Sequence, residues 1–318
     1  MHPALSVIVF TTLSGAGYGL VCWVGVYAAA GLLPADRILG AVAMMLALGA
    51  VTVGLLSSTF HLGHPERAWR AFSQWRSSWL SREGVASVVT YVPILVFGAG
   101  WVLLGRTSGM WGWFGLASAV CAIVTVVCTA YIYRSLKPIP RWYNHWVVPN
   151  YLALSAMTGA LLLTMLADVF GYRLPGAHML ALTAIAVALL CKLGYWHFID
   201  NASEMSTPES ATGLGSLGKV RLFEAPHTSE NYLLKEMGFR IARKHAQKLR
   251  AISIALAFVL PFALTVAAYA ATGVPAAVCS LIAAATALVG VLTERWLFFA
   301  EAKHTVTLYY GRSLGASA

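Results

Sequence analysis

Charged residues are scarce in this sequence of 318 residues: they make up 11% of the chain, whereas 59% is hydrophobic. Soluble domains average about 25% charged residues. The composition therefore excludes an ordinary soluble domain and favours a protein that lies in a lipid bilayer. Acidic residues are rarer than basic ones, which gives a net charge of +10. Because the basic residues lie between apolar runs, we interpret this charge as a sign of membrane topology and not of nucleic-acid binding.

Closely spaced cysteines are also absent. The five cysteines lie inside apolar runs and no two form a CxxC pair, so the sequence predicts neither an iron–sulfur cluster nor a disulfide framework nor another metal site. The N-terminus has no basic segment of the kind that precedes a cleavable signal peptide. The first apolar run is therefore expected to be a membrane span.

Eight apolar runs are long enough to cross a bilayer, which takes about 20 residues. They cover residues 5–31, 38–60, 85–104, 111–133, 148–169, 177–199, 251–272 and 275–299. The predicted fold class is an all-α integral membrane protein, in which residues 1–318 form a single bundle of about eight transmembrane helices. In the first run, Gly15 and Gly19 are four positions apart and are expected to share a face that a neighbouring helix approaches closely.

The distribution of lysine and arginine predicts the orientation in the membrane. With eight spans, both termini share one side with the long connections 61–84, 134–147 and 200–250. The opposite side holds only Arg37, Arg106 and Arg173 of the 22 basic residues. The positive-inside rule then places both termini in the cytoplasm of a bacterium, with the protein in its inner membrane.

The longest connection, 200–250, is expected to contain an amphipathic helix over 229–250, because Leu233, Met237 and Ile241 recur every four positions. This helix would lie on the membrane surface or bind a soluble subunit. A solvated loop helix leading into the seventh span is the alternative.

The densest polar cluster runs from His61 to Glu83, where the second span ends and the third begins. A quinone that takes up two electrons also takes up two protons, and this cluster has the groups for that chemistry. His61 is the candidate donor to a quinone carbonyl, Glu83 the proton relay, and Arg67 the charge that orients a carbonyl or holds the carboxylate. The candidate neighbours are His64, Trp79 and Ser81. The alternative is that these residues only anchor the helix ends at the headgroups.

Two further features bear on ligands and partners. None of the nine histidines lies in the middle of a span, and His61 with His197 is the best-placed pair for haem, so no haem is expected. The candidate docking residues for a partner subunit are Arg70, Arg76, Arg141, Trp142 and Tyr143. Aromatic residues at such positions also form the ordinary interfacial belt, which is the alternative for Trp142 and Tyr143.

With these residues in view, the sequence resembles the membrane-anchor subunits of the dimethyl sulfoxide reductase type. The motifs are His61-Leu62-Gly63-x-Pro65-x-Arg67-Ala68 with Ser81-x-Glu83, and Pro140-x-Trp142-Tyr143-x-x-Trp146. The resemblance implies a complex with a molybdopterin catalytic subunit and a four-cluster iron–sulfur subunit, which hold the metal cofactors. It also implies that His61, Arg67 and Glu83 are the quinone-site residues, for ubiquinone or menaquinone.

The predicted cytoplasmic orientation is similar to that of the sulfite dehydrogenase anchors within this group. Electrons from sulfite oxidation would then pass to the quinone pool. A quinol-oxidising anchor of a dimethyl sulfoxide or polysulfide reductase is the alternative within the group. A secondary transporter is a distant one, because transporters usually carry mid-span charges and these spans are expected to have almost none. A purely structural tether is the third.

Overall fold

The computed structural model describes residues 4–61, 64–202, 206–224 and 245–310, and within these ranges the protein is helical without strands. Eight helical segments are long and apolar enough to cross a membrane, which confirms the predicted fold class. The spans are α1 (Leu5–Ala29), α2 (Arg37–Ser57), α3 (Trp79–Leu104), α4 (Met110–Arg134), α5 (Val147–Val169), α6 (Ala177–Asn201), the continuous segment α10 (Ala246–Ile254), η4 (Ala255–Val259) and α11 (Leu260–Ala270), and α12 (Val274–Ala300). The short helices are η1 (Ser58–His61), η2 (Pro65–Gln74), α7 (Pro208–Thr212), η3 (Gly215–Leu217) and η5 (Thr305–Tyr310).

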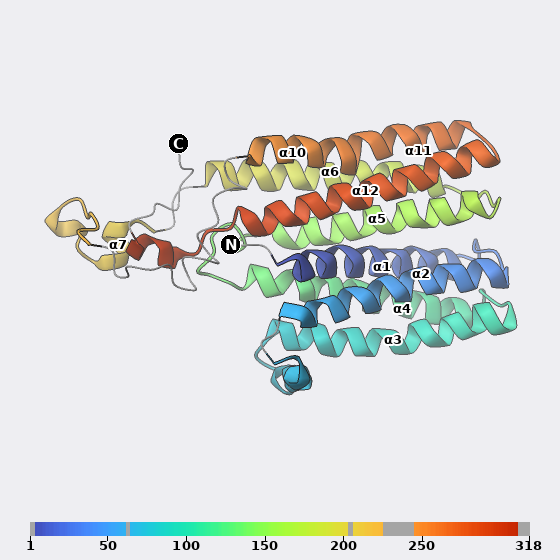
Figure 1. Ribbon diagram of the computed structural model, residues 1–318. Helices are drawn as coiled ribbons and strands as arrows, with labels where there is room; N and C mark the ends of the chain where they lie inside the picture. The colour runs from blue at the N-terminus through green and yellow to red at the C-terminus, as the bar shows by residue number, and fades with distance from the viewer. Residues whose placement is uncertain (1–3, 62–63, 203–205, 225–244, 311–318) are drawn as a thin grey trace.

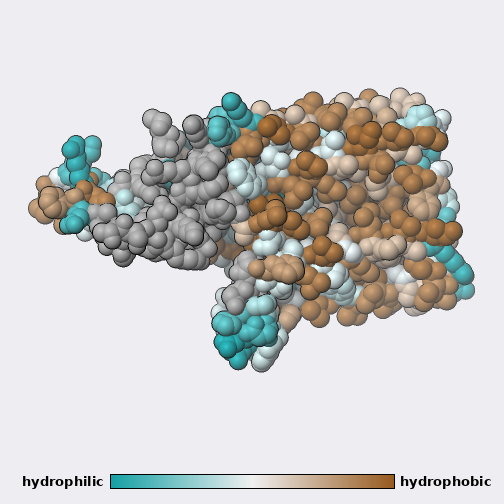
Figure 2. Space-filling model, in the orientation of Figure 1, coloured by the Kyte–Doolittle hydropathy of each residue, from teal (hydrophilic) through white to brown (hydrophobic). Residues whose placement is uncertain are grey.

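The spans form two groups of four that lie side by side (Figure 1). The first half consists of α1 to α4, and the second half of α5, α6, the α10–α11 segment and α12. Helix α1 joins the halves, because it packs against α2 and α4 in its own half and against α5 and α12 in the other. The outer faces of both halves carry exposed apolar side chains, brown in Figure 2, as expected for helices in contact with lipid.

All the long connections emerge at one end of the bundle, on the left of Figure 1, and the turns at the other end are short. We call the end at which α1 begins and α12 finishes the basic end, because most of the lysines and arginines lie there. The alternation of long and short connections that the apolar runs predicted is therefore present in the structure.

Glycine pairs set the closest helix crossings. A Cβ atom built on Gly19 of α1 would lie 1.9 Å from the carbonyl oxygen of Ser155 on α5, and Gly159 of α5 faces Gly19 in turn. A second crossing places Gly25 of α1 against Gly115 of α4. The expectation is confirmed most directly at Gly19. At Gly15, α5 also approaches, because the Ser155 hydroxyl donates to the Gly15 carbonyl oxygen at 2.6 Å, but a Cβ there would meet no atom within 4 Å. On the other side of the crossing, Trp23 donates to the carbonyl oxygen of Ala156 at 2.8 Å, so hydrogen bonds join α1 and α5 on both sides of it.

Two spans begin earlier than predicted. Helix α3 starts at Trp79 and not at residue 85, because the Ser78 hydroxyl caps its first turn by accepting from the backbone N–H of Ser81. The seventh span starts at Ala246 and not at residue 251. Most of the surface helix predicted over 229–250 lies outside the described residues, and the described part, from Ala246 on, belongs to this span.

Candidate functional site

Glu83 lies in the second turn of α3, near the basic end. Because α3 begins at Trp79, Glu83 lies within the helix and not at its first residue. Only 5% of the residue is exposed. The carboxyl lies next to Thr129 of α4, and its Oε1 atom is buried without a hydrogen-bond partner. Among the described residues, no ion pair is made to this carboxyl. An ionisable side chain inside a membrane protein without a partner is costly, and by default it marks a functional position.

The segment between α2 and α3 folds back onto the first turns of α3. The Ser81 hydroxyl donates to the carbonyl oxygen of Ala71 in η2. Arg82 donates to the carbonyl oxygens of Trp75 and Arg76, at 3.0 and 2.6 Å. The Trp79 ring is stacked on Tyr131 of α4 with 4.4 Å between centroids. Ser81 and Arg82 therefore hold the connection against the start of α3, and Trp79 packs that start against α4, within one turn of Glu83.

The other predicted site residues are less closely placed. Arg67 lies in η2 with 56% of its side chain exposed, and its ion pair is with Glu66 at 3.7 Å and not with Glu83. His64 is also exposed and contacts the same Glu66 carboxylate at 3.0 Å. His61 is the last residue of η1, and its side chain lies outside what the structure describes. The structure thus groups Glu83, Ser81 and Trp79, and leaves the roles of His61 and Arg67 as predictions.

The predicted docking residues divide into two sets. Arg70, Arg76 and Tyr143 are exposed at the basic end. Trp142 is only 2% exposed, donates to the carbonyl oxygen of Phe298 at 2.9 Å and is stacked on the Phe298 ring. The prediction that Trp142 lies on a docking surface is therefore wrong, because α12 extends far enough to cover it.

Arg141, the fifth predicted docking residue, is mostly buried. It forms an ion pair with Glu301 at 3.6 Å. Glu301 also accepts from Arg250, which holds Asp200 through two further hydrogen bonds of 2.5 and 3.0 Å. These charges join the ends of α6, α10 and α12, so Arg141 serves the packing of the second half.

A buried charged cluster in the second half was missed from the sequence. Lys192 of α6 and Arg295 of α12 both form ion pairs with the carboxylate of Glu294, and all three side chains are at most 2% exposed. The sequence signal was present, because these residues interrupt apolar runs. The expectation of spans almost free of ionisable groups is wrong for α6 and α12, because Lys192 and Arg295 lie inside the bundle and not at exposed helix ends.

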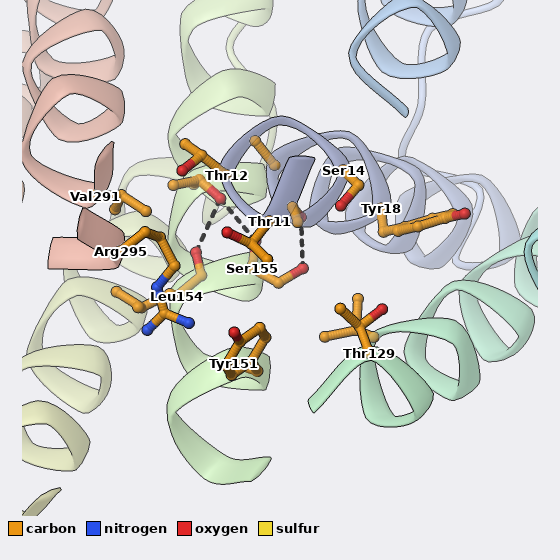
Figure 3. Close-up of a pocket in the computed structure, with 14 residues that line it drawn as sticks. Thr11, Thr12, Ser14, Tyr18, Thr129, Tyr151, Leu154, Ser155, Val291 and Arg295 are labelled. Carbon is orange, nitrogen blue, oxygen red and sulfur yellow. Dashed lines mark hydrogen bonds between the residues drawn. The ribbon is translucent and has the colours of Figure 1, made fainter. Parts of the chain in front are cut away.

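A small polar cavity was missed as well. It lies where the halves meet and is lined by α1, α4, α5 and α12 (Figure 3). About 20 Å³ is available to the centres of water molecules, which is room for about one water and not for a quinone ring. The lining residues are Thr11, Thr12, Ser14, Gly15, Ala16, Tyr18, Val126, Thr129, Tyr151, Leu154, Ser155, Thr158, Val291 and Arg295.

Groups suited to metal binding are absent from the described residues: no three His, Cys, Asp or Glu side chains come together in a way that could hold a metal ion. The five cysteines are all free thiols.

Comparison with known proteins gives consistent matches along the sequence. The family model described as DMSO reductase anchor subunit (DmsC) matches residues 1–311. A subunit of the sulfite dehydrogenase of Allochromatium vinosum is 32% identical over 98% of this chain and 99% of its own length. A subunit of the anaerobic dimethyl sulfoxide reductase of Escherichia coli is 28% identical over 50% of this chain and 54% of its own length.

Proposed function

Because this chain belongs to the DMSO reductase anchor subunit family, we propose that it passes electrons between a quinone in the membrane and an iron–sulfur subunit bound at its basic end. The molybdopterin subunit of the same complex would carry out the chemistry on the soluble substrate. The relative that matches over nearly the full length of both proteins belongs to a sulfite dehydrogenase, which favours sulfite as the electron donor. Electrons would then flow from sulfite to the quinone.

Glu83 is the observation that carries this proposal. A quinone reduced by two electrons must also receive two protons, and a carboxyl group in the second turn of α3 can deliver one of them. The carboxyl is buried, has no cation beside it and lies near the end of the bundle that carries the long connections. Its proton is therefore not committed to a structural ion pair, unlike the carboxylates of Glu294 and Glu301.

The surface around Glu83 suits a ligand that arrives from lipid. Phe60 of η1, Trp69 and Phe72 of η2, and Trp75, which follows η2, are exposed large aromatic side chains. Phe72 lies beside Gly84 of α3, and the carbonyl oxygen of Trp75 accepts from Arg82. Aromatic rings of this kind gather at the level of the headgroups. A quinone ring approaching from the bilayer would meet this aromatic surface before it reached α3. The internal cavity is too small for it, so we place the ring on the outer side of α3.

The orientation forms part of the same proposal. The basic end carries the connections rich in lysine and arginine, which the positive-inside rule assigns to the cytoplasm. The exposed Arg70, Arg76 and Tyr143 would then face the iron–sulfur subunit from inside the cell. This places electron entry, the aromatic surface and Glu83 at one side of the membrane.

The test is the Glu83→Gln variant of the assembled complex. Glutamine keeps the shape of the side chain but has no proton to release, so sulfite-dependent quinone reduction should fall about 100-fold or more. Sulfite oxidation with a soluble dye that accepts electrons from the partner subunits should stay at the wild-type rate. Glu224→Gln, at an exposed position away from the site, is the matched control and should reduce quinone normally. Undiminished quinone turnover in Glu83→Gln would remove the residue from the reaction.

A further inference from the structure

The internal cavity presents an unusual set of polar atoms. Three buried groups that line it have no hydrogen-bond partner: the hydroxyls of Thr12 and Tyr151, and the Nη2 atom of Arg295. The Tyr18 side chain also lines the cavity, but its hydroxyl points away from the other three groups, toward α3 (Figure 3). The residues that carry the three groups are each more than nine-tenths buried. A buried donor without a partner costs about 1–3 kcal/mol, so three around one space indicate a bound polar ligand.

The other walls of the cavity supply acceptors. The hydroxyls of Ser14 and Ser155 each donate their proton to a backbone carbonyl at 2.6 Å, and Thr129 does so at 3.1 Å. Their oxygen lone pairs are left for a ligand in the cavity. A small anion would be attracted by the donors but repelled by these lone pairs. Water both donates and accepts, and the space has the size of about one water molecule.

The cavity lies between two groups of buried charge. On one side, Thr129 and Tyr18 are neighbours of Glu83. On the other side, Arg295 belongs to the cluster with Glu294 and Lys192. Figure 3 shows Thr129 and Arg295 reaching the cavity from opposite sides. Water held there would therefore lie between the carboxyl of Glu83 and the cluster.

The charges of the two groups are complementary. The cluster contains two cations and one carboxylate, so it has an excess charge of +1 in the interior. Glu83 becomes an uncompensated anion whenever it releases its proton. The titratable groups that face it from the neighbouring helices are Tyr18 of α1 and Cys128 and Tyr133 of α4, and none of these is a cation. On its own helix, Arg82 is held by the carbonyl oxygens of Trp75 and Arg76.

We propose that this cavity binds ordered water that couples Glu83 to the Lys192–Glu294–Arg295 cluster, so that the excess positive charge of the cluster stabilises the carboxylate left when Glu83 gives up its proton. The inference rests on the proposed function for its purpose, because proton release by Glu83 matters only if the quinone receives that proton. Lys192 and Arg295 are positioning residues in this scheme. They act on Glu83 through charge and do not touch the quinone.

Lys192→Met provides the sharpest test, because it removes the excess cation and leaves the neutral Glu294–Arg295 pair in place. The whole complex is titrated while infrared spectroscopy follows the carboxylic acid band of Glu83, identified by its loss in Glu83→Gln. In Lys192→Met the band should persist to a pH about one unit higher than in the wild type. Lys137→Met removes the same charge from an exposed position at the basic end and should leave the titration unchanged.

The role of the bound water is tested with Tyr151→Phe, which removes one of the unpartnered hydroxyls and keeps the ring. In this background the shift caused by Lys192→Met should become smaller, whereas it should be retained with Thr164→Val, a buried threonine of α5 outside the cavity. A high-resolution structure of the complex should show water in the cavity.

The inference and the proposed function fail in different ways. A dry cavity, or an unchanged titration in a Lys192→Met protein that melts like a folded complex, would overturn the inference. If the Lys192→Met complex does not assemble, two other measurements test the inference: the presence of water in the wild-type cavity, and the titration of Glu83 in Tyr151→Phe. An unchanged titration of Glu83 in Tyr151→Phe would then refute the inference. The infrared titration does not depend on turnover. Normal quinone reduction by Glu83→Gln would therefore end the proposed function without altering this result.

Discussion

The crossing of α1 and α5 leads to a quantitative prediction for Gly19→Ala. The added methyl group would lie 1.9 Å from the carbonyl oxygen of Ser155, where ordinary contact begins at 3.4 Å. The nearest atoms belong to the backbone of α5, so no side-chain rotation relieves the clash. The two helices would have to separate by about 1.5 Å, and a gap of even half that size forfeits a quarter or more of each dispersion contact.

We expect Gly19→Ala to lower the free energy of unfolding by about 3 kcal/mol, the upper part of the range for overpacked interiors. Gly49→Ala is the matched control, inside α2, because a Cβ there would meet no atom within 4 Å and the residue does not line the cavity. It should be neutral or stabilise α2 by up to about 1 kcal/mol, since alanine is the better helix former. The assay is unfolding of the purified protein in mixed detergent micelles, followed by circular dichroism.

The same crossing predicts a coupling between the two helices. Gly159→Ala should cost about as much as Gly19→Ala, because each glycine faces the other. Once one substitution has forced the helices apart, the second should add less than its own cost. Equal stability of Gly19→Ala and Gly49→Ala would refute the reasoning, and would mean that α1 and α5 do not meet at Gly19.

Two further predictions concern charged groups at opposite ends of the bundle. Replacing Glu294 with glutamine leaves the cations of Lys192 and Arg295 buried without a counter-charge, and should cost about 3–5 kcal/mol in the same unfolding assay, whereas Lys192→Met should cost clearly less. Asp36 caps α2, and the backbone N–H of Leu39, followed by the Tyr172 hydroxyl, holds the pKa of its carboxyl below the usual range. The stabilising effect of this carboxylate should be present above pH about 4 and lost as the pH falls through the lowered pKa. Asp36→Ala should therefore melt at a lower temperature than the wild type at pH 7, and at nearly the same temperature in acid. A difference in melting temperature that does not depend on pH would contradict this.

Local features of the sequence were sufficient for the bundle itself. Hydropathy is a property of each run of about 20 residues, so the eight spans and the alternation of long and short connections could be predicted without knowing which helices touch. The basic residues predicted the same division into two ends. Glu83 could be chosen as a candidate site residue from local sequence as well, because its position beside the start of a span follows from the order of the residues.

The remaining features depend on contacts between distant parts of the sequence. Trp142 is buried because the carbonyl oxygen of Phe298, more than 150 positions away, accepts its indole N–H. Lys192 and Glu294 are 102 positions apart and become a pair only when α6 packs near α12. From the local sequence, Trp142 and Lys192 would both be assigned to the membrane interface. No local pattern distinguishes an interfacial position from a buried one.

The sequence alone determined that this protein is a helical membrane protein with a basic end, since transfer of apolar residues into a bilayer is decided run by run. Only the tertiary structure decided that the Cα of Gly19 packs directly against the backbone of α5, whereas the space beside that of Gly15 is open, and that three unpartnered polar groups line one cavity. Both outcomes depend on how the two halves cross. The geometry of this crossing depends on the shapes of all the side chains between the two halves. It cannot be predicted from composition or from the spacing of residues along the sequence.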